Sequence, residues 1–263
     1  LCVLTANTIF GIFIPISKHL LSGLISPIML TLFRILGACL LFWTASLFVK
    51  DTKLTPKALA WFFFFALTGI LLNQGLFIFG LGHTSPVDAS VILTATPFSG
   101  NTGGNSGSLW GDLIVLFTTI CAATYFTTSK PITKQYTPIT MMKWMFTFSA
   151  IIYTPIVFNT CAEEAANLQN LTLPDWSGVI YVVAGATFVA YLLLPMGIKR
   201  MRPTTVAMYI YVQPIVSSVV AILVGQDNFM WEKLFAALLV FAGVYIVTSS
   251  PRAGDKSVEN DPT

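Results

Sequence analysis

The chain has 263 residues, of which 55% are hydrophobic and 10% charged, and its mean hydropathy is +0.78 with a formal net charge of +3. A soluble domain carries about 25% charged residues because its surface faces water, so this composition excludes a soluble globular protein. The small net charge, with Lys and Arg in short clusters between apolar runs, argues against nucleic-acid binding.

Eight apolar segments are long enough to cross a membrane, since about 20 helical residues span a hydrocarbon core of about 30 Å. In chain order they are 2–22, 28–49, 59–82, 110–129, 139–160, 177–198, 204–225 and 231–249. The apolar stretch 87–98 is too short to cross, and 100–108 has the Gly/Ser/Asn composition of a flexible linker. The polar tail 251–263 is expected to be disordered. The pattern predicts an all-α, polytopic membrane protein, and the opening of the chain on Leu1 inside an apolar run suggests that residues precede it.

Markers recur at matched spacings in the two halves of the chain, which indicates an internal repeat. The pairs are Lys18–Pro27 and Lys130–Pro138, Trp61 and Trp176, and Pro86–Pro97 and Pro203–Pro214. We therefore predict a first repeat over 1–99 and a second over 109–250, joined by the linker. The second repeat continues for about 35 residues past Pro214, whereas the first stops almost directly after Pro97. By this comparison the first repeat lacks part of its fourth helix and all of its fifth; the alternative is a natural re-entrant hairpin over 86–99.

The distribution of basic residues predicts that the two repeats are inverted. The basic clusters are Lys50, Lys53 and Lys57 in the first half, and Lys199, Arg200 and Arg202 in the second. The first cluster follows the second segment of its repeat, and the other follows the third segment. Because basic loops stay on the cytoplasmic side, the halves are expected to enter the membrane in opposite senses, with both termini cytoplasmic.

Inverted repeats are a recurring plan of secondary transporters, in which two halves rock about a central site. Several runs also resemble the EamA-type family of the drug/metabolite transporter superfamily. They are Gly111-Asp112, Ser129-Lys130-Pro131, Tyr136-Thr137-Pro138, Tyr209 to Pro214 and Phe241-Ala-Gly-Val-Tyr. The resemblance implies a ten-helix plan of two inverted five-helix repeats and export of amino acids or similar metabolites. Two departures are the shortened first repeat and Gln226-Asp227, which stands where such proteins often carry a glutamate.

Polar residues inside apolar segments are candidates for a substrate site, because an unpartnered polar group is costly in lipid. Asn7 and Gly11 fall near one face of the first segment, although Gly11 could equally serve close helix packing. Arg34 lies about seven residues into the second segment, roughly 10 Å below the outer surface. It could hold a carboxylate through its planar fork, but snorkelling to the interface is the slightly favoured alternative.

Further candidates lie on the third segment and on the Pro-containing segments of both halves. One of Asn73 and Gln74 could face the cavity while the other bonds a neighbouring helix. Tyr209 and Gln213 are the preferred substrate contacts, as an aromatic wall beside an amide. Remaining candidates are Thr94 as a counterpart in the first repeat, Pro97 and Pro214 as kinks, and, more weakly because aromatic residues often face lipid, Tyr125, Trp144 and Tyr191.

No catalytic motif, metal-ligand spacing or phosphate-binding Gly loop is found in the sequence, so we expect neither an enzyme nor a cofactor. Nor does a convincing carboxylate lie at mid-membrane, which favours a facilitator or coupling through the absent segment. The sequence thus predicts a multi-pass transporter of the inner membrane, with a small metabolite and the lipid bilayer as partners and a homodimer left open. The alternatives are a non-transporting paralogue and, less favoured, a membrane enzyme acting on lipid. The substrate itself is not readable from the sequence.

Overall fold

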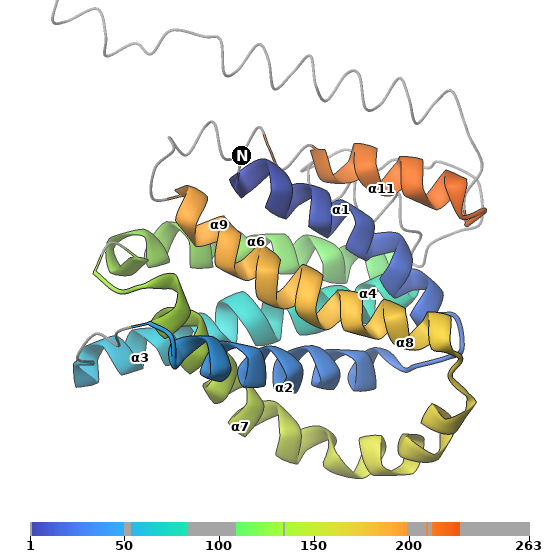
Figure 1. The fold of residues 1–263 in the computed structure, drawn as a ribbon, viewed down its shortest axis with the longest axis horizontal. Coiled ribbons are helices and arrows are strands. Elements are labelled where there is room, and N and C mark those ends of the chain that lie inside the picture. Colours follow the sequence, from blue (N-terminus) through green and yellow to red (C-terminus); the bar gives the residue numbers. More distant parts are fainter. Residues whose placement is uncertain are drawn as a thin grey trace, which may run out of the picture.

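A computed structural model describes residues 2–49, 54–83, 109–133, 135–198, 209 and 212–226. Throughout this part of the chain the regular structure is helical, arranged as a bundle of long helices (Figure 1). The first half comprises α1 (Cys2–Leu21), α2 (Pro27–Ser46), and a third long helix made of α3 (Pro56–Phe65), the π-helix η1 (Ala66–Gly75) and α4 (Leu76–His83). The second half comprises α6 (Leu109–Thr133), α7 (Pro138–Glu164), the 3-10 helix η2 (Ala165–Asn170), α8 (Leu173–Ile180), the π-helix η3 (Tyr181–Val189), α9 (Ala190–Ile198) and α11 (Val212–Leu223).

Five helices of the described part are long and apolar enough to cross a membrane. They are Cys2–Leu21, Pro27–Ser46, Pro56–Leu81, Pro138–Glu164 and Leu173–Gly197. They confirm five of the segments expected from the sequence. The predicted segment 204–225 is represented by α11, whereas 231–249 and the stretch 86–99 fall outside the described residues. The described part of the chain is therefore all-helical, as expected of a multi-pass membrane protein, and the ten-helix inverted plan stays a prediction.

The starts of three helices are fixed by one local motif, a hydroxyl residue followed by proline. Ser26, Thr55 and Thr137 occupy the N-cap positions of α2, α3 and α7, and the side chain of each accepts a hydrogen bond from the backbone N–H three residues later. Proline at the first helical position needs no hydrogen-bond partner there and already has a helical φ. These short polar sites therefore end each interhelical turn and begin the next apolar helix.

The packing of the two halves is reciprocal. α1 lies against η3 and α9 of the second half, and α6 lies against η1 and α4 of the first, while α2 packs along α7 (Figure 1). α2 and α7 are antiparallel: Ser26 before α2 bonds Glu164 at the end of α7, and Trp43 late in α2 bonds Thr147 early in α7. The third helix of each half is thus held between helices of the other half.

Close approach between helices depends on glycine at two positions. A Cβ atom on Gly37 of α2 would lie 2.4 Å from Cγ1 of Val183 in η3, and one on Gly197 of α9 would lie 2.1 Å from Cγ2 of Val3 in α1. Both distances are shorter than any real carbon contact, so only glycine fits there. Small residues that let backbones approach are the usual basis of helix packing in membranes.

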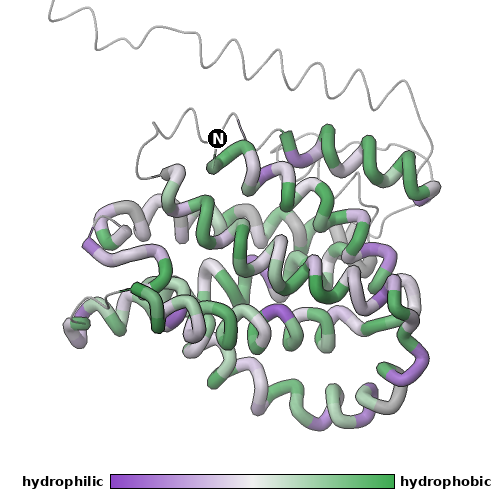
Figure 2. Tube along the Cα trace, in the orientation of Figure 1, coloured by the Kyte–Doolittle hydropathy of each residue, from purple (hydrophilic) through white to green (hydrophobic). Residues whose placement is uncertain are grey.

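Large apolar side chains on the outside of the bundle form the surface that faces lipid. Exposed examples are Leu40, Leu47, Phe48, Ile151, Ile156, Phe158 and Ile180. Figure 2 shows hydrophobic residues along the lengths of the helices and hydrophilic residues gathered mostly at the turns. This is the distribution expected of helices surrounded by hydrocarbon.

Candidate functional site

Arg34 lies in the first half of α2 and points into the bundle, with only 2% of its surface exposed. Its Nε donates a hydrogen bond of 2.9 Å to Oγ1 of Thr187 in η3. Its guanidinium carbon lies 4.5 Å from the ring centre of Phe13 in α1, a cation–π contact. The snorkelling favoured from the sequence is therefore wrong, because the side chain is enclosed by the preceding helix α1 and by η3 of the second half rather than extended along lipid.

The charge of Arg34 has no counter-ion among the described residues. Its Nη1 atom is buried and has no hydrogen-bond partner there. The carboxylates of the described helices with placed side chains lie at helix ends, namely Glu163 and Glu164 in α7 and Asp175 in α8. A buried, uncompensated cation is among the costliest features of a membrane interior, so a free donor at this position points to an anionic ligand.

Gln74 supplies a second free donor in the same region. It is 5% exposed, and its Nε2 has no hydrogen-bond partner among the described residues. Tyr191, in α9, lies beside both groups, since its hydroxyl interacts electrostatically with Arg34 and contacts the side chain of Gln74. An amide nitrogen carries two N–H groups, so Nε2 of Gln74 retains at least one donor that no described residue accepts. With Thr187, the bonded partner of Arg34, these residues form one buried polar cluster of Arg34, Gln74, Thr187 and Tyr191, here called the Arg34 cluster.

The two π-helices deliver polar side chains to the Arg34 cluster. η1 carries Gln74 and η3 carries Thr187. Each π-helix begins five residues after the tryptophan of its half, Trp61 or Trp176, so the two stand at matched positions. π-helical turns are rare and occur mostly at functional sites, because they rotate side chains and release backbone carbonyls. Thr187 shows the π-helical spacing, because its hydroxyl also donates to the carbonyl of Val182, five residues earlier and 2.8 Å away.

Aromatic rings enclose the Arg34 cluster. Phe13 lies under the guanidinium and 6.4 Å from Phe77 between ring centres. Tyr125 of α6 is buried, interacts electrostatically with Tyr191 and packs edge-on against Phe65 at 5.7 Å. The cluster thus combines two incompletely bonded hydrogen-bond donors with an apolar aromatic surround, which suits a small organic anion. Within the described ranges no group of three or more His, Cys, Asp or Glu could hold a metal ion.

The preferred substrate contacts from the sequence lie elsewhere and have partners. Nε2 of Gln213 in α11 donates to Oδ1 of Asn7 in α1 at 2.5 Å, and Nδ2 of Asn7 donates to the carbonyl of Val3. Tyr209 packs against the apolar cluster that includes Val3. Beside them, a Cβ on Gly11 would lie 2.7 Å from Cβ of Val216, so Gly11 serves close packing of α1 on α11.

The other candidates divide between packing and the undescribed part of the chain. Asn73 donates to the carbonyl of Thr118, a bond between neighbouring helices of the kind expected for one member of the Asn73–Gln74 pair. Trp144 lies against Trp43 and Phe148. Pro214 lies in the first turn of α11, and α11 continues past it to Leu223. Thr94 and Pro97 lie outside the described residues.

Sequence reasoning missed Thr187 and Phe13, the two direct partners of Arg34. Thr187 could have been noticed as a polar residue within an apolar segment, four residues before Tyr191. Phe13 carries no such signal, since phenylalanine occurs 21 times in the chain and is common in its apolar segments.

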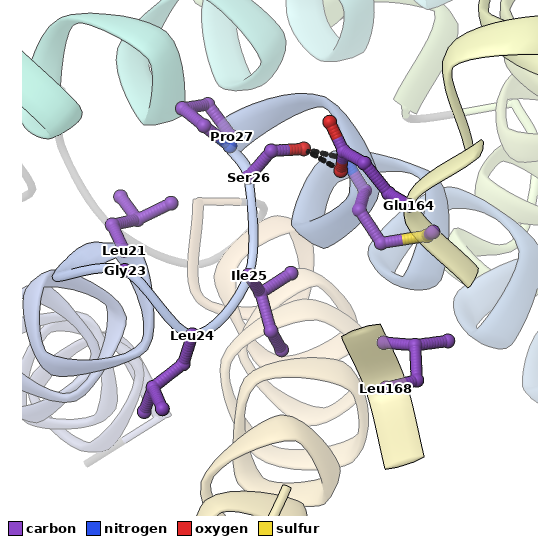
Figure 3. Close-up of a pocket in the computed structure, with 9 residues that line it drawn as sticks. Leu21, Gly23, Leu24, Ile25, Ser26, Pro27, Glu164 and Leu168 are labelled. Carbon is purple, nitrogen blue, oxygen red and sulfur yellow. Dashed lines mark hydrogen bonds between the residues drawn. The ribbon is translucent and has the colours of Figure 1, made fainter. Parts of the chain in front are cut away.

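A separate pocket lies at the end of the bundle where α1 turns into α2 (Figure 3). It has a volume of about 290 Å³ and is lined by Leu21, Gly23, Leu24, Ile25, Ser26, Pro27, Met29, Glu164 and Leu168. Its polar feature is a hydrogen bond that Ser26 Oγ donates to Oε2 of Glu164. Close by in the chain, Nε2 of His19 lies 3.5 Å from Oδ1 of Asp175. Both contacts join the α1–α2 region to the second half.

Comparison with known proteins identifies the family of the chain. The model of the EamA-like transporter family matches residues 1–100 and again residues 109–249. The uncharacterized transporter YyaM of Bacillus subtilis (strain 168) is 21% identical over 232 residues, which covers 74% of this chain and 75% of that protein. A crystal structure described only as that of a protein has a similar fold, with a TM-score of 0.64, 13% identity, and coverage of 94% of this chain and 97% of its own. The chain belongs to the EamA-like transporter family.

Proposed function

We propose that this protein is a secondary transporter that exports small carboxylate-bearing metabolites, the class that includes amino acids, across the inner membrane. The observation that carries the proposal is Arg34, a buried cation whose Nη1 has no partner in the described part of the chain. A charge of this kind, in a multi-pass protein of a transporter family, is most simply explained by an anionic cargo.

The transport mechanism we propose is alternating access between two inverted repeats. Reciprocal packing of α1 with α9 and of α6 with α4 supports this mechanism, because helices of each half pack against the third helix of the other half. The Arg34 cluster draws Arg34 and Gln74 from the first half and Thr187 and Tyr191 from the second. Relative movement of the halves would therefore open and close the site, as in other inverted-repeat transporters.

The proposed orientation places the turn between α1 and α2 outside the cell. Lys50 and Lys53 follow α2, and basic residues favour the cytoplasmic side. The bond from Ser26 to Glu164 and the pair of His19 with Asp175 then close the outer end, and both would separate when the transporter opens outward. Both termini would be cytoplasmic.

Transport can be tested with the purified full chain in proteoliposomes. Vesicles loaded with a mixture of radiolabelled amino acids and other small carboxylates should release part of the mixture faster than protein-free vesicles, with saturation. The Arg34→Gln variant, reconstituted at the same density, should match the protein-free rate. Equal release from wild-type and protein-free vesicles would contradict the proposal and favour a non-transporting paralogue.

A further inference from the structure

The Arg34 cluster contains features that restrict the net charge of the cargo, in addition to the donors that can bind a carboxylate. We infer that the site takes its substrate as a monoanion, a small monocarboxylate without an ammonium group, such as a 2-oxo acid. Nη1 of Arg34 and Nε2 of Gln74 would hold its carboxylate. This inference rests on the proposed transport function and narrows its substrate class.

The first step is the pairing of the two free donors. Nη1 of Arg34 and Nε2 of Gln74 are both buried and each retains an N–H that no described residue accepts with normal geometry. The hydroxyl of Tyr191 contacts the side chain of Gln74 and lies within electrostatic range of Arg34. A carboxylate has two oxygens, each of which accepts hydrogen bonds, so one ligand can occupy two donors that lie close together. Nε of Arg34 is already held by Thr187 at 2.9 Å, which fixes the guanidinium plane and leaves Nη1 available.

The second step is the absence, around these donors, of a group that would hold an ammonium. Where side chains are described, the carboxylates of Glu163, Glu164 and Asp175 all lie at helix ends. The face of Phe13, which could attract a cation, is occupied by Arg34 itself at 4.5 Å. Recognition of an amino acid would need a partner for each of its charges, whereas this cluster supplies only the positive one. Among the described residues, the remaining acceptors for an ammonium are backbone carbonyls of η1 and η3 and the side-chain oxygens of Gln74, Thr187 and Tyr191, and the efflux experiment tests them.

The third step concerns the energy source. A carrier of a monoanion moves net charge, so an inside-negative membrane potential drives it outward without a coupling ion. A potential of 100 mV would favour the anion on the outside by about fifty-fold. This agrees with the sequence, in which no convincing carboxylate for a proton relay lies at mid-membrane. A monoanionic cargo would thus explain three features together: the outward direction of transport, the positive charge of the site, and a sequence without a convincing mid-membrane carboxylate relay.

The test uses three pairs of probes that share a carbon skeleton: pyruvate with alanine, 4-methyl-2-oxopentanoate with leucine, and phenylpyruvate with phenylalanine. Radiolabelled efflux is measured from proteoliposomes containing the full chain, with the potential set by a potassium gradient and valinomycin. We expect saturable efflux of at least one 2-oxo acid, at least ten-fold faster than its amino acid and accelerated by an inside-negative potential. Arg34→Gln should abolish it, whereas Asn7→Ala, which changes the α1–α11 contact, should retain it.

The outcomes separate the inference from the transport proposal. Efflux of amino acids at rates equal to or above those of their 2-oxo acids, without response to potential, would overturn the monoanion inference and leave a transporter in place. Efflux of a 2-oxo acid that persists in Arg34→Gln would also overturn it. No saturable efflux of any of the six compounds would overturn the monoanion inference, and the transport proposal would then be decided by the efflux of the wider mixture described above. Each variant must elute as a single species and melt cooperatively, so that a loss of flux is not a loss of fold.

Discussion

Two polar contacts within the bundle differ in how completely their side chains are hydrogen-bonded. Between α1 and α11, Asn7 and Gln213 bond each other, and Asn7 also bonds the carbonyl of Val3. In the Arg34 cluster, Arg34 and Gln74 are both buried, yet each retains a donor without a partner in the described part of the chain. The first contact resembles the hydrogen bonds that hold membrane helices together. The second has the incomplete hydrogen bonding that a ligand would complete, which shows that polarity alone does not distinguish a structural contact from a site.

The largest effect is expected for Arg34→Gln. Loss of one member of a buried charged pair costs about 2–5 kcal/mol, so substrate binding should weaken by at least about thirty-fold, and transport at subsaturating substrate should fall with it. Substrate concentration series in proteoliposomes measure this effect. Arg34→Lys is the matched control, since it keeps the charge but loses the planar fork. Its apparent affinity should lie between those of wild type and Arg34→Gln. Equal apparent affinities in all three proteins would remove Arg34 from the site.

The second-largest effect is expected for Gln74→Leu, a substitution that retains the helix. The hydrogen bond of a neutral donor to a charged ligand contributes about 1.5–3 kcal/mol, so the apparent affinity should drop about ten- to a hundred-fold. Asn73→Leu is its neighbouring control, because Asn73 bonds the carbonyl of Thr118 instead. If Asn73→Leu weakened affinity more than Gln74→Leu, the roles assigned to this pair would be reversed.

Gly37→Ala tests whether the Arg34 cluster depends on close approach of α2 and η3. The new methyl group would lie 2.4 Å from Cγ1 of Val183, and valine is a stiff, β-branched side chain. Overpacking of this kind costs about 1–3 kcal/mol, and η3 should shift away from Arg34. A lowered melting temperature together with weaker substrate binding is expected. Gly75→Ala is the control, since its nearest neighbour, Cγ2 of Thr31, would lie at an ordinary 3.8 Å.

Asn7→Ala and Gln213→Ala should produce the smallest effects and mainly alter stability. Side-chain hydrogen bonds between membrane helices average about 0.6 kcal/mol, with a maximum near 1.7 kcal/mol. A double-mutant cycle on melting in detergent should give a coupling energy in this range, with transport within about three-fold of wild type. A collapse of transport in Gln213→Ala at unchanged stability would instead restore Gln213 as a substrate contact.

The helices were predictable from the sequence because each crossing needs about 20 apolar residues and the hydroxyl–proline pairs mark where three helices start. The burial of Arg34 was not predictable, since it depends on Phe13 in α1 and on Thr187, 153 residues away in the chain. The π-helices were also missed, because a stretch of wider turns inside an apolar helix has no compositional signature. η3 carries Thr187, which bonds Arg34, and η1 carries Gln74.

The candidate site was predicted in part. Arg34, Gln74, Tyr125 and Tyr191 were all named from polarity or aromatic character, but their proximity could not be read from the sequence. Tyr209 and Gln213 ranked above them because helical spacing places these two on one face. Spacing gives the face of a helix and not the neighbour that it meets, and that neighbour, Asn7, satisfies Gln213.

The most direct test of the account is the melting temperature of wild type and Arg34→Gln in detergent, each with and without a saturating 2-oxo acid identified by the efflux assay. An uncompensated charge destabilises the empty protein, so Arg34→Gln should melt at or above the wild-type temperature without ligand. Ligand should raise the melting temperature of wild type and leave that of Arg34→Gln unchanged. A variant that melts well below wild type, yet gains as much from the ligand, would show that Arg34 is a structural residue and contradict the account.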